Sequence, residues 1–222
     1  MTQNSPPEKQ NVVKHRGRPR KAPDDQVARK QLIKAGLVYL TERGFSDVSV
    51  DEILKASGTT KGTFYHHFKS KADFGQDLIE AYHSYFAAKL MSWFDNDTLS
   101  PLHRLRGFIK DAETGMAKHD FRRGCLVGNL GQEMAVLPDA MCSRLIEVLQ
   151  DWQSRTAACL VLAQQQGEIS CELDAAAMAE FFWIGWEGAV LRAKLERKPD
   201  PLRRFADGFF TLLSISPHQS QG

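Results

Sequence analysis

The sequence predicts an all-α protein, and three observations lead to this prediction. Apolar residues recur at spacings of three to five along most of the chain, which is the spacing of one helix face. No window alternates apolar and polar residues at every second position, and runs rich in Val, Ile and Thr between Asn-Gly or Asp-Gly turns are missing. We expect a flexible basic arm over 1–24, a three-helix domain over 25–73, a helical body over 74–216 and a disordered tail over 217–222.

The arm and the first two helices are marked by local signals. The arm holds four prolines and few apolar side chains, so it cannot bury enough surface to offset the entropy of ordering. The first helix is expected to begin near Asp25 and to end at Gly44, a natural C-cap. The second follows Ser49, which forms a capping box with Glu52, and it stops at Gly58.

Two more helices are expected to begin close behind. One opens near Thr60, and a longer one opens after Ser70, a typical N-cap residue. Pro138, Gly167 and Pro199 separate the later segments. We expect those helices near 101–119, 125–136, 139–166, 174–196 and 200–213.

Composition and hydropathy exclude several classes of protein. The 222 residues are 42% hydrophobic and 25% charged, which is ordinary for a globular chain and excludes a collagen-like or mostly disordered one. The most apolar stretch, Ala175–Leu191, is interrupted by Glu180 and Glu187 and is too short to cross a bilayer. The N-terminus lacks the apolar segment of a signal peptide. No membrane contact is expected.

The cysteines indicate a reducing compartment. No C-x-x-C pair occurs, so neither a structural zinc site nor a disulfide framework is expected. No Walker loop, dinucleotide fingerprint or H-E-x-x-H occurs either, so we expect no metal and no cofactor. We expect a cytoplasmic protein with four reduced thiols: Cys125, Cys142, Cys159 and Cys171.

Charge is distributed unevenly along the chain. Residues 1–74 carry 14 Lys and Arg against 8 Asp and Glu, whereas residues 75–222 carry 15 against 19. A basic front end joined to a mildly acidic body is typical of a protein in which one domain meets a polyanion and the other does not.

The segment from the second to the third helix has the length and turn position of a helix-turn-helix. One face is expected to be buried and consists of Ile53, Leu54, Ala56, Phe64 and Phe68. The other face carries donors and acceptors suited to base edges and phosphates: Lys61, Thr63, Tyr65 and His66. Lys71 and the helix start after Ser70 would hold a backbone phosphate. The alternative is a small helical bundle with a polar face.

Read as a unit, 29–74 resembles the DNA-binding domain of the TetR family of one-component repressors. The resemblance is carried by Gly44-Phe45, Ser49-Val50, Ile53, Ala56-Ser57-Gly58, Lys61-Gly62-Thr63-Phe64-Tyr65-His66-His67-Phe68, Ser70-Lys71 and Phe74. A departure is Gly36, where the family usually has a helix-favouring Ala; the glycine would cost about 1 kcal/mol of local stability.

The resemblance implies a TetR-like homodimer that binds double-stranded DNA, a variable ligand-binding body, and a four-helix interface from the helices near 174–196 and 200–213. By it, Lys61, Gly62, Thr63 and Tyr65 would face bases or sugars, and His67 and Lys71 phosphates. The full set of expected DNA-binding residues is Arg16, Arg18, Thr60, Lys61, Gly62, Thr63, Tyr65, His66, His67 and Lys71.

The arm contains a second candidate DNA contact. Arg16-Gly17-Arg18-Pro19 matches the core of an AT-hook, whose arginines lie along a narrow minor groove. The alternative is a basic tail that only raises non-specific affinity. Deletion of 1–22 should weaken operator binding and its salt dependence if the hook is real.

The body is expected to bind a small-molecule effector. Cys125 follows two arginines at an expected helix start, and both features favour a thiolate, the form that adds to electron-poor alkenes. The alternative for Cys125 is that it acts only as a small buried apolar residue. The alternative for the aromatic cluster at 181–186 is that it belongs to the hydrophobic core and lines no pocket. The candidate effector-binding residues are Cys125, Asn129, Trp183, Trp186, Arg192 and Lys194.

Two short segments narrow the effector class. Gly-Cys-Leu-x-Gly-Asn-Leu at 124–130 and Gly-Ala-Val-Leu-Arg-Ala-Lys at 188–194 resemble the family branch whose repressors answer to reactive electrophiles and to acrylate. If the effector is instead a carboxylate held non-covalently, a cation must offset its desolvation. The nearby candidates for this cation are Arg192, Lys194, Arg122 and Arg123. The alternative for each of them is a surface or interface residue.

Three functions compete at this point. The first is a ligand-responsive repressor in which the effector moves the fourth helix and changes the spacing of two recognition helices. The second is a thiol-dependent enzyme that uses Cys125 as nucleophile and His119 as base, although no third orienting residue is evident. The third is an architectural DNA-binding protein without a ligand, which would not need so large a body.

Overall fold

The computed structural model describes residues 23–214, and within that range every regular element is an α-helix. The predicted all-α class is confirmed. The expected AT-hook, with Arg16 and Arg18, and the C-terminal tail lie outside the described residues.

The N-terminal three-helix group consists of α1 (Pro23–Glu42), α2 (Val50–Ser57) and α3 (Lys61–His67). The predicted capping box is present, because the Ser49 hydroxyl accepts from the Glu52 amide while the Glu52 carboxylate accepts from the Ser49 amide. Gly58 ends α2 in the left-handed region, with φ of 65°. The capping box therefore determines where α2 begins, and the left-handed glycine at its end determines the tight turn between α2 and α3.

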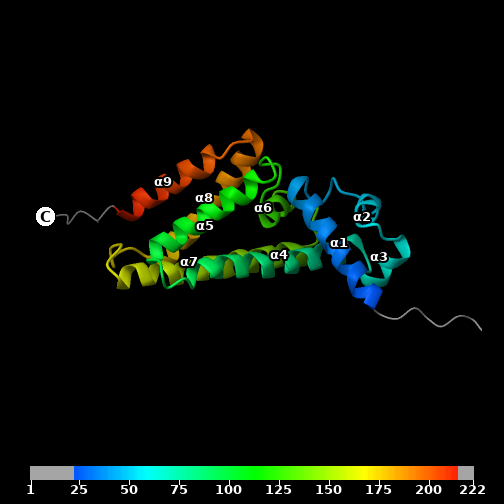
Figure 1. Ribbon diagram of the computed structural model, residues 1–222, viewed down its shortest axis with the longest axis horizontal. Helices are drawn as coiled ribbons and strands as arrows, with labels where there is room; N and C mark the ends of the chain where they lie inside the picture. The colour runs from blue at the N-terminus through cyan, green and yellow to red at the C-terminus, as the bar shows by residue number, and fades with distance from the viewer. Residues whose placement is uncertain (1–22, 215–222) are drawn as a thin grey trace, which may run out of the picture.

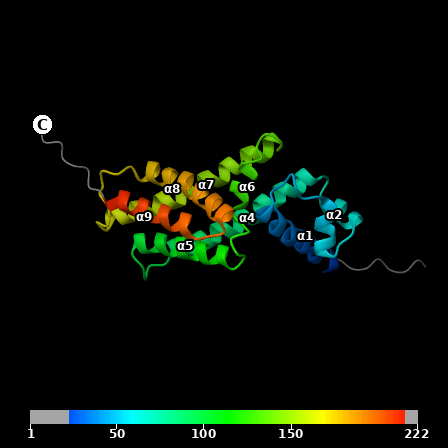
Figure 2. The same ribbon diagram turned by 90° about the horizontal axis from the view of Figure 1, so that it is seen from above.

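The body begins with α4 (Lys71–Phe94), which runs from the three-helix group along the body (Figure 1). The remaining helices are α5 (Pro101–Ala117), α6 (Leu126–Gly131), α7 (Asp139–Gln165), α8 (Ala175–Glu196) and α9 (Asp200–Ser214). The helices α8 and α9 pack side by side (Figures 1 and 2). Within the described range, no helix is long and apolar enough to cross a membrane.

One helix is shorter than expected. The segment near 125–136 was predicted as one helix, but α6 covers only Leu126–Gly131. The chain after it turns, and the carboxylate of Glu133 accepts from the amides of Phe45 at 2.8 Å and Ser46 at 2.7 Å. A tertiary contact to the three-helix group thus replaces a continued helix.

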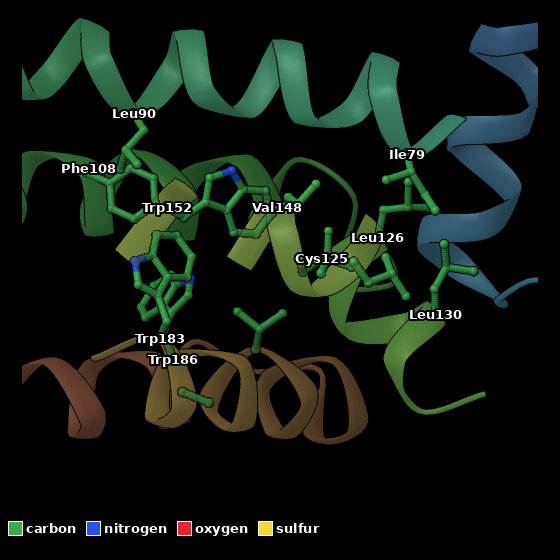
Figure 3. Packing of buried hydrophobic residues seen from close by; sticks show 14 of the residues in the cluster. Ile79, Leu90, Phe108, Cys125, Leu126, Leu130, Val148, Trp152, Trp183 and Trp186 are labelled. Carbon is green, nitrogen blue, oxygen red and sulfur yellow. The ribbon is translucent and has the colours of Figure 1, made fainter. Parts of the chain in front are cut away.

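Aromatic side chains fill the middle of the body (Figure 3). Trp152 and Trp183 are fully buried with ring centroids 5.0 Å apart, and Phe108 packs beside them. The Trp183 indole donates to the Thr156 hydroxyl at 2.9 Å, so its one polar atom is satisfied inside the core. Trp183 is therefore core, the alternative that the sequence left open.

The helices α1 and α4 approach each other closely at Gly36. A Cβ atom there would lie 2.6 Å from Phe74 and 2.8 Å from Leu78. The prediction that this glycine merely weakens the first helix is incomplete, because its missing side chain lets the two helices meet.

Candidate nucleic-acid interface and ligand cleft

The helix α3 presents a polar face at one end of the molecule. Lys61, Tyr65 and His66 are exposed, and half of the Tyr65 surface is accessible although its ring packs edge-on against Phe64. The buried side consists of Ile53, Leu54, Phe64 and Phe68, as predicted. Ala56 was expected on that side but is exposed, and it borders a surface hollow between the end of α2 and α1.

Two of the expected phosphate contacts are engaged within the protein. The Lys71 ammonium donates to the Phe45 carbonyl at 2.6 Å and lies 4.4 Å from the centre of the Phe45 ring. Burial lowers the pKa of Lys71. The His67 side chain is only 9% exposed, and its Nε2 atom faces Asp25 at the start of α1. In this conformation both side chains fasten the three-helix group.

A cleft of about 500 Å³ opens in the body beside the three-helix group. It is formed by α4, α5, α8 and the segment before α6. Its lining includes Thr41, Tyr82, Tyr85, Phe86, Lys89, Asp111, Met116, His119, Arg123, Cys125, Trp186, Glu187 and Val190. The cleft combines an apolar wall, one thiol and several titratable groups, which is typical of a site for a small polar ligand.

Cys125 and Glu187 form the chemical centre of this cleft. Burial, followed by the nearby Glu187 carboxylate, raises the pKa of the Cys125 thiol well above its ordinary value. The prediction of a thiolate is therefore wrong for this state, since α6 offers only six residues and Arg122 pairs with Glu42. Burial also raises the pKa of Glu187 to about 7, although a hydrogen bond with Cys125 lowers it in part.

Tyr82 completes the group from α4. Burial, followed by the charges of Cys125 and Glu187, raises the pKa of the Tyr82 phenol well above its ordinary value. The Glu187 carboxylate rests on Gly128, where a Cβ atom would lie 2.0 Å from Oε2. A thiol and a carboxyl group that titrates near neutrality thus lie together, an arrangement in which the carboxylate can take the thiol proton.

Cations line the same cleft. Lys89 pairs with Asp111 at 3.2 Å, and a ring nitrogen of His119 lies 3.4 Å from the Arg123 guanidinium. Across residues 23–214, Arg123 has no carboxylate partner. An arginine without a carboxylate partner, in the same cleft as a thiol, is suited to a carboxylate ligand.

The expected effector-binding residues separate into three groups. Cys125 and Trp186 line the cleft, whereas Trp183 lies in the core. Asn129 and Lys194 do not line it but donate to the end of α1. Arg192 is exposed and pairs with Glu196 one turn later, the surface role that the sequence left open.

The end of α1 is held by the segment that also forms the cleft. The Thr41 carbonyl accepts from the Gly124 amide at 2.9 Å, from Asn129 Nδ2 at 2.8 Å and from Lys194 Nζ at 3.3 Å. Gly124 directly precedes Cys125. The cleft and the three-helix group are therefore joined through adjacent residues.

Sequence reasoning missed Tyr82 and Glu187. A signal for Glu187 was available, because an acidic residue inside the most apolar stretch of the chain needs a reason to be there. Tyr82 carried no such signal, since it reads as an ordinary apolar position of α4.

Comparisons with known proteins agree on one class. Residues 32–77 match the model "Bacterial regulatory proteins, tetR family", and 101–209 match "Tetracyclin repressor-like, C-terminal domain". The chain is 60% identical over 194 residues to the transcriptional regulator AcuR of Cereibacter sphaeroides, covering 87% of this chain and 89% of that protein.

Two further relatives extend this agreement. The transcriptional repressor DhaR of a Mycobacterium species is 30% identical over 185 residues, 83% of this chain and 91% of that protein. The crystal structure of the regulatory protein TetR from Rhodobacter sphaeroides superposes with a TM-score of 0.82 at 59% identity, covering 82% of this chain and 97% of that one. These relatives are regulators of transcription and not enzymes.

Proposed function

Because the chain belongs to the TetR family of bacterial transcriptional regulators, we propose that this repressor binds a palindromic operator as a homodimer and is released by a small electrophilic carboxylate such as acrylate. One observation carries the proposal. Gly124 and Cys125 are consecutive, and the first holds the end of α1 while the second lines the cleft. A ligand that moves Cys125 must also disturb the three-helix group.

The chemistry of the cleft supports an electrophilic carboxylate. Arg123 would bind the carboxylate, and the Glu187 carboxylate would take the Cys125 proton. The thiolate sulfur then bonds to the β-carbon of acrylate as the C=C π bond breaks, and Glu187 returns the proton to the α-carbon. The sum is the addition of a thiol across a double bond, and it needs no oxidant or reductant.

Release of DNA would follow from the contacts at the end of α1. An adduct on Cys125 enlarges a buried side chain at the start of α6 and displaces Gly124 and Tyr82 from their present positions. The bonds from this segment to Thr41 weaken, and α1 turns with α2 and α3 attached. The spacing of two α3 helices on one operator would then be lost.

Homodimer formation is supported by apolar surface on the last two helices. Side chains on one face of α8 and α9 are exposed in a single chain: Phe181, Ile184, Leu191, Leu195 and Leu212. Such a patch is typical of a protein interface. The matching face of a second copy is its proposed partner.

The first experiment measures binding of the full chain to DNA upstream of its own gene at about 150 mM salt, with acrylate or the unreactive propionate added to the complex. We expect specific binding that acrylate releases. Cys125→Ser should bind DNA with unchanged affinity but resist release, whereas the exposed-thiol control Cys171→Ser should behave as wild type.

Two results separate the parts of the proposal. Intact-protein mass spectrometry should show one added acrylic acid per chain in wild type and none in Cys125→Ser. If propionate releases DNA as well as acrylate does, covalent sensing is refuted and the carboxylate site at Arg123 remains. If DNA of random sequence binds equally well, the operator proposal itself fails.

A further inference from the structure

Three side chains with metal-ligating atoms converge where the start of α1 meets the end of α3. Asp25 Oδ1 lies 3.1 Å from His67 Nε2 and 3.5 Å from His66 Nε2, and the ligand atoms of all three residues lie within 4.8 Å of one another. Four ligands at about 2.1 Å around a tetrahedral ion are about 3.4 Å apart. Two of the three separations already match that value, and the third is at most 4.8 Å and involves the exposed ring of His66.

His67 supplies an independent observation. Its side chain is more than nine-tenths buried, and its Nε2 atom is shielded from solvent. Although Asp25 is near, Nε2 makes no hydrogen bond to any described residue. A buried imidazole nitrogen without a hydrogen bond is costly, and a metal ion at this point would satisfy it.

The surroundings leave Asp25 available. Arg29 lies one turn further along α1, but its guanidinium pairs with Asp77 and lies 5.7 Å from the centre of the Phe68 ring. Among the described residues, the two imidazoles are the only basic side chains within 4 Å of the Asp25 carboxylate. The carboxylate is thus directed at the imidazoles.

We propose that Asp25, His66 and His67 bind one divalent transition-metal ion, with Zn²⁺ as the expected occupant and water in the open position. Two imidazoles and one carboxylate are a zinc ligand set, whereas Mg²⁺ and Ca²⁺ prefer oxygen ligands alone. The ion fastens the first turn of α1 to the last residues of α3, the helix with the polar face. This site does not depend on the proposed effector or operator.

The test uses the untagged full chain after treatment with a chelator. Calorimetric titration with Zn²⁺ should show one tight site per chain. With Co²⁺ in place of Zn²⁺, the visible absorption spectrum should show the bands that are typical of a four-coordinate ion. His66→Ala and Asp25→Asn should each weaken Zn²⁺ binding at least about tenfold. The exposed histidine of α5 provides a matched control, since His103→Ala should bind as wild type does.

A second readout does not depend on calorimetry. At a hundredfold excess over the wild-type Kd, Zn²⁺ should raise the Tm of wild type by roughly 5 °C and that of His66→Ala by about half of this or less. His66 is exposed, so this variant should fold normally. Equal Zn²⁺ affinity in wild type and both site variants, or the absence of saturable binding, would overturn the assignment.

Discussion

Glu187 is a carboxyl group held against an apolar wall, and its acidity follows from that position. Burial raises its pKa from an ordinary 4.5 to about 7. The protonated form is therefore the one that the fold prefers. At physiological pH a fraction of Glu187 is ionised and can accept a proton, which is the state that the proposed addition at Cys125 needs.

The raised pKa of Glu187 predicts a pH-dependent stability. The contribution of Glu187 to stability is fully present below pH 4.5 and is lost as the pH rises through about 7. Between these values, Glu187 ionises in the unfolded chain but stays mostly protonated in the folded one. Between about pH 5 and about pH 8, the ionisation of Glu187 should lower the free energy of unfolding of wild type by on the order of 2 kcal/mol. Glu187→Gln should not show this decrease. Urea unfolding at both pH values measures it.

The exposed Glu180 on the same helix provides the control for this measurement. Glu180→Gln should keep the pH dependence of wild type. If the stabilities of wild type and Glu187→Gln change equally with pH, Glu187 does not have the raised pKa assigned to it.

Glu133 is the second residue with a distinct prediction. Its carboxylate accepts from the amides of Phe45 and Ser46 across the boundary between body and three-helix group. Glu133→Ala should cost about 1–3 kcal/mol, because two amides lose a charged acceptor. Gln132→Ala next to it should cost little, since Gln132 is exposed and donates only within its own turn. Urea midpoints compare the two, and equal losses would contradict this role of Glu133.

At the scale of helices, the sequence predicted those features whose causes lie within a few residues along the chain. The capping box at Ser49 and the turn at Gly58 are decided within a few residues, and both were predictable. The end of α6 was not, because Glu133 bonds to Phe45 from a distant part of the chain. Cys125 shows the same limit, since the groups that set its pKa come from α4 and α8.

The contact between α1 and α4 also belongs to this scale. Gly36→Ala should destabilise the protein by about 1–3 kcal/mol, because a methyl group would overlap Phe74 and Leu78 and outweigh the better helix propensity of Ala. Urea unfolding measures the loss. Gly115→Ala is the control, since its Cβ would meet only Lys89 at 3.7 Å and should be neutral or stabilising. A Gly36→Ala protein as stable as wild type would show that α1 and α4 can move apart at little cost in free energy.

At the scale of the whole molecule, the exposed apolar face of α8 and α9 predicts the assembly state. Ile184 on this face is 67% exposed, and Ile184→Glu should shift the protein from dimer to monomer by placing a charge in the proposed interface. Ile146 on α7 is 56% exposed, and Ile146→Glu should leave the dimer intact. Sedimentation velocity separates the species, and a dimer that survives Ile184→Glu would place the interface elsewhere.

The three donors at Thr41 have a consequence for how firmly the three-helix group is attached to the body. A carbonyl oxygen has two lone pairs, yet Gly124, Asn129 and Lys194 all direct a hydrogen at this one atom. The bond from Lys194, at 3.3 Å, is the longest. When one donor withdraws, the other two still bond to the Thr41 carbonyl. The end of α1 therefore stays bonded to the body until all three donors have withdrawn.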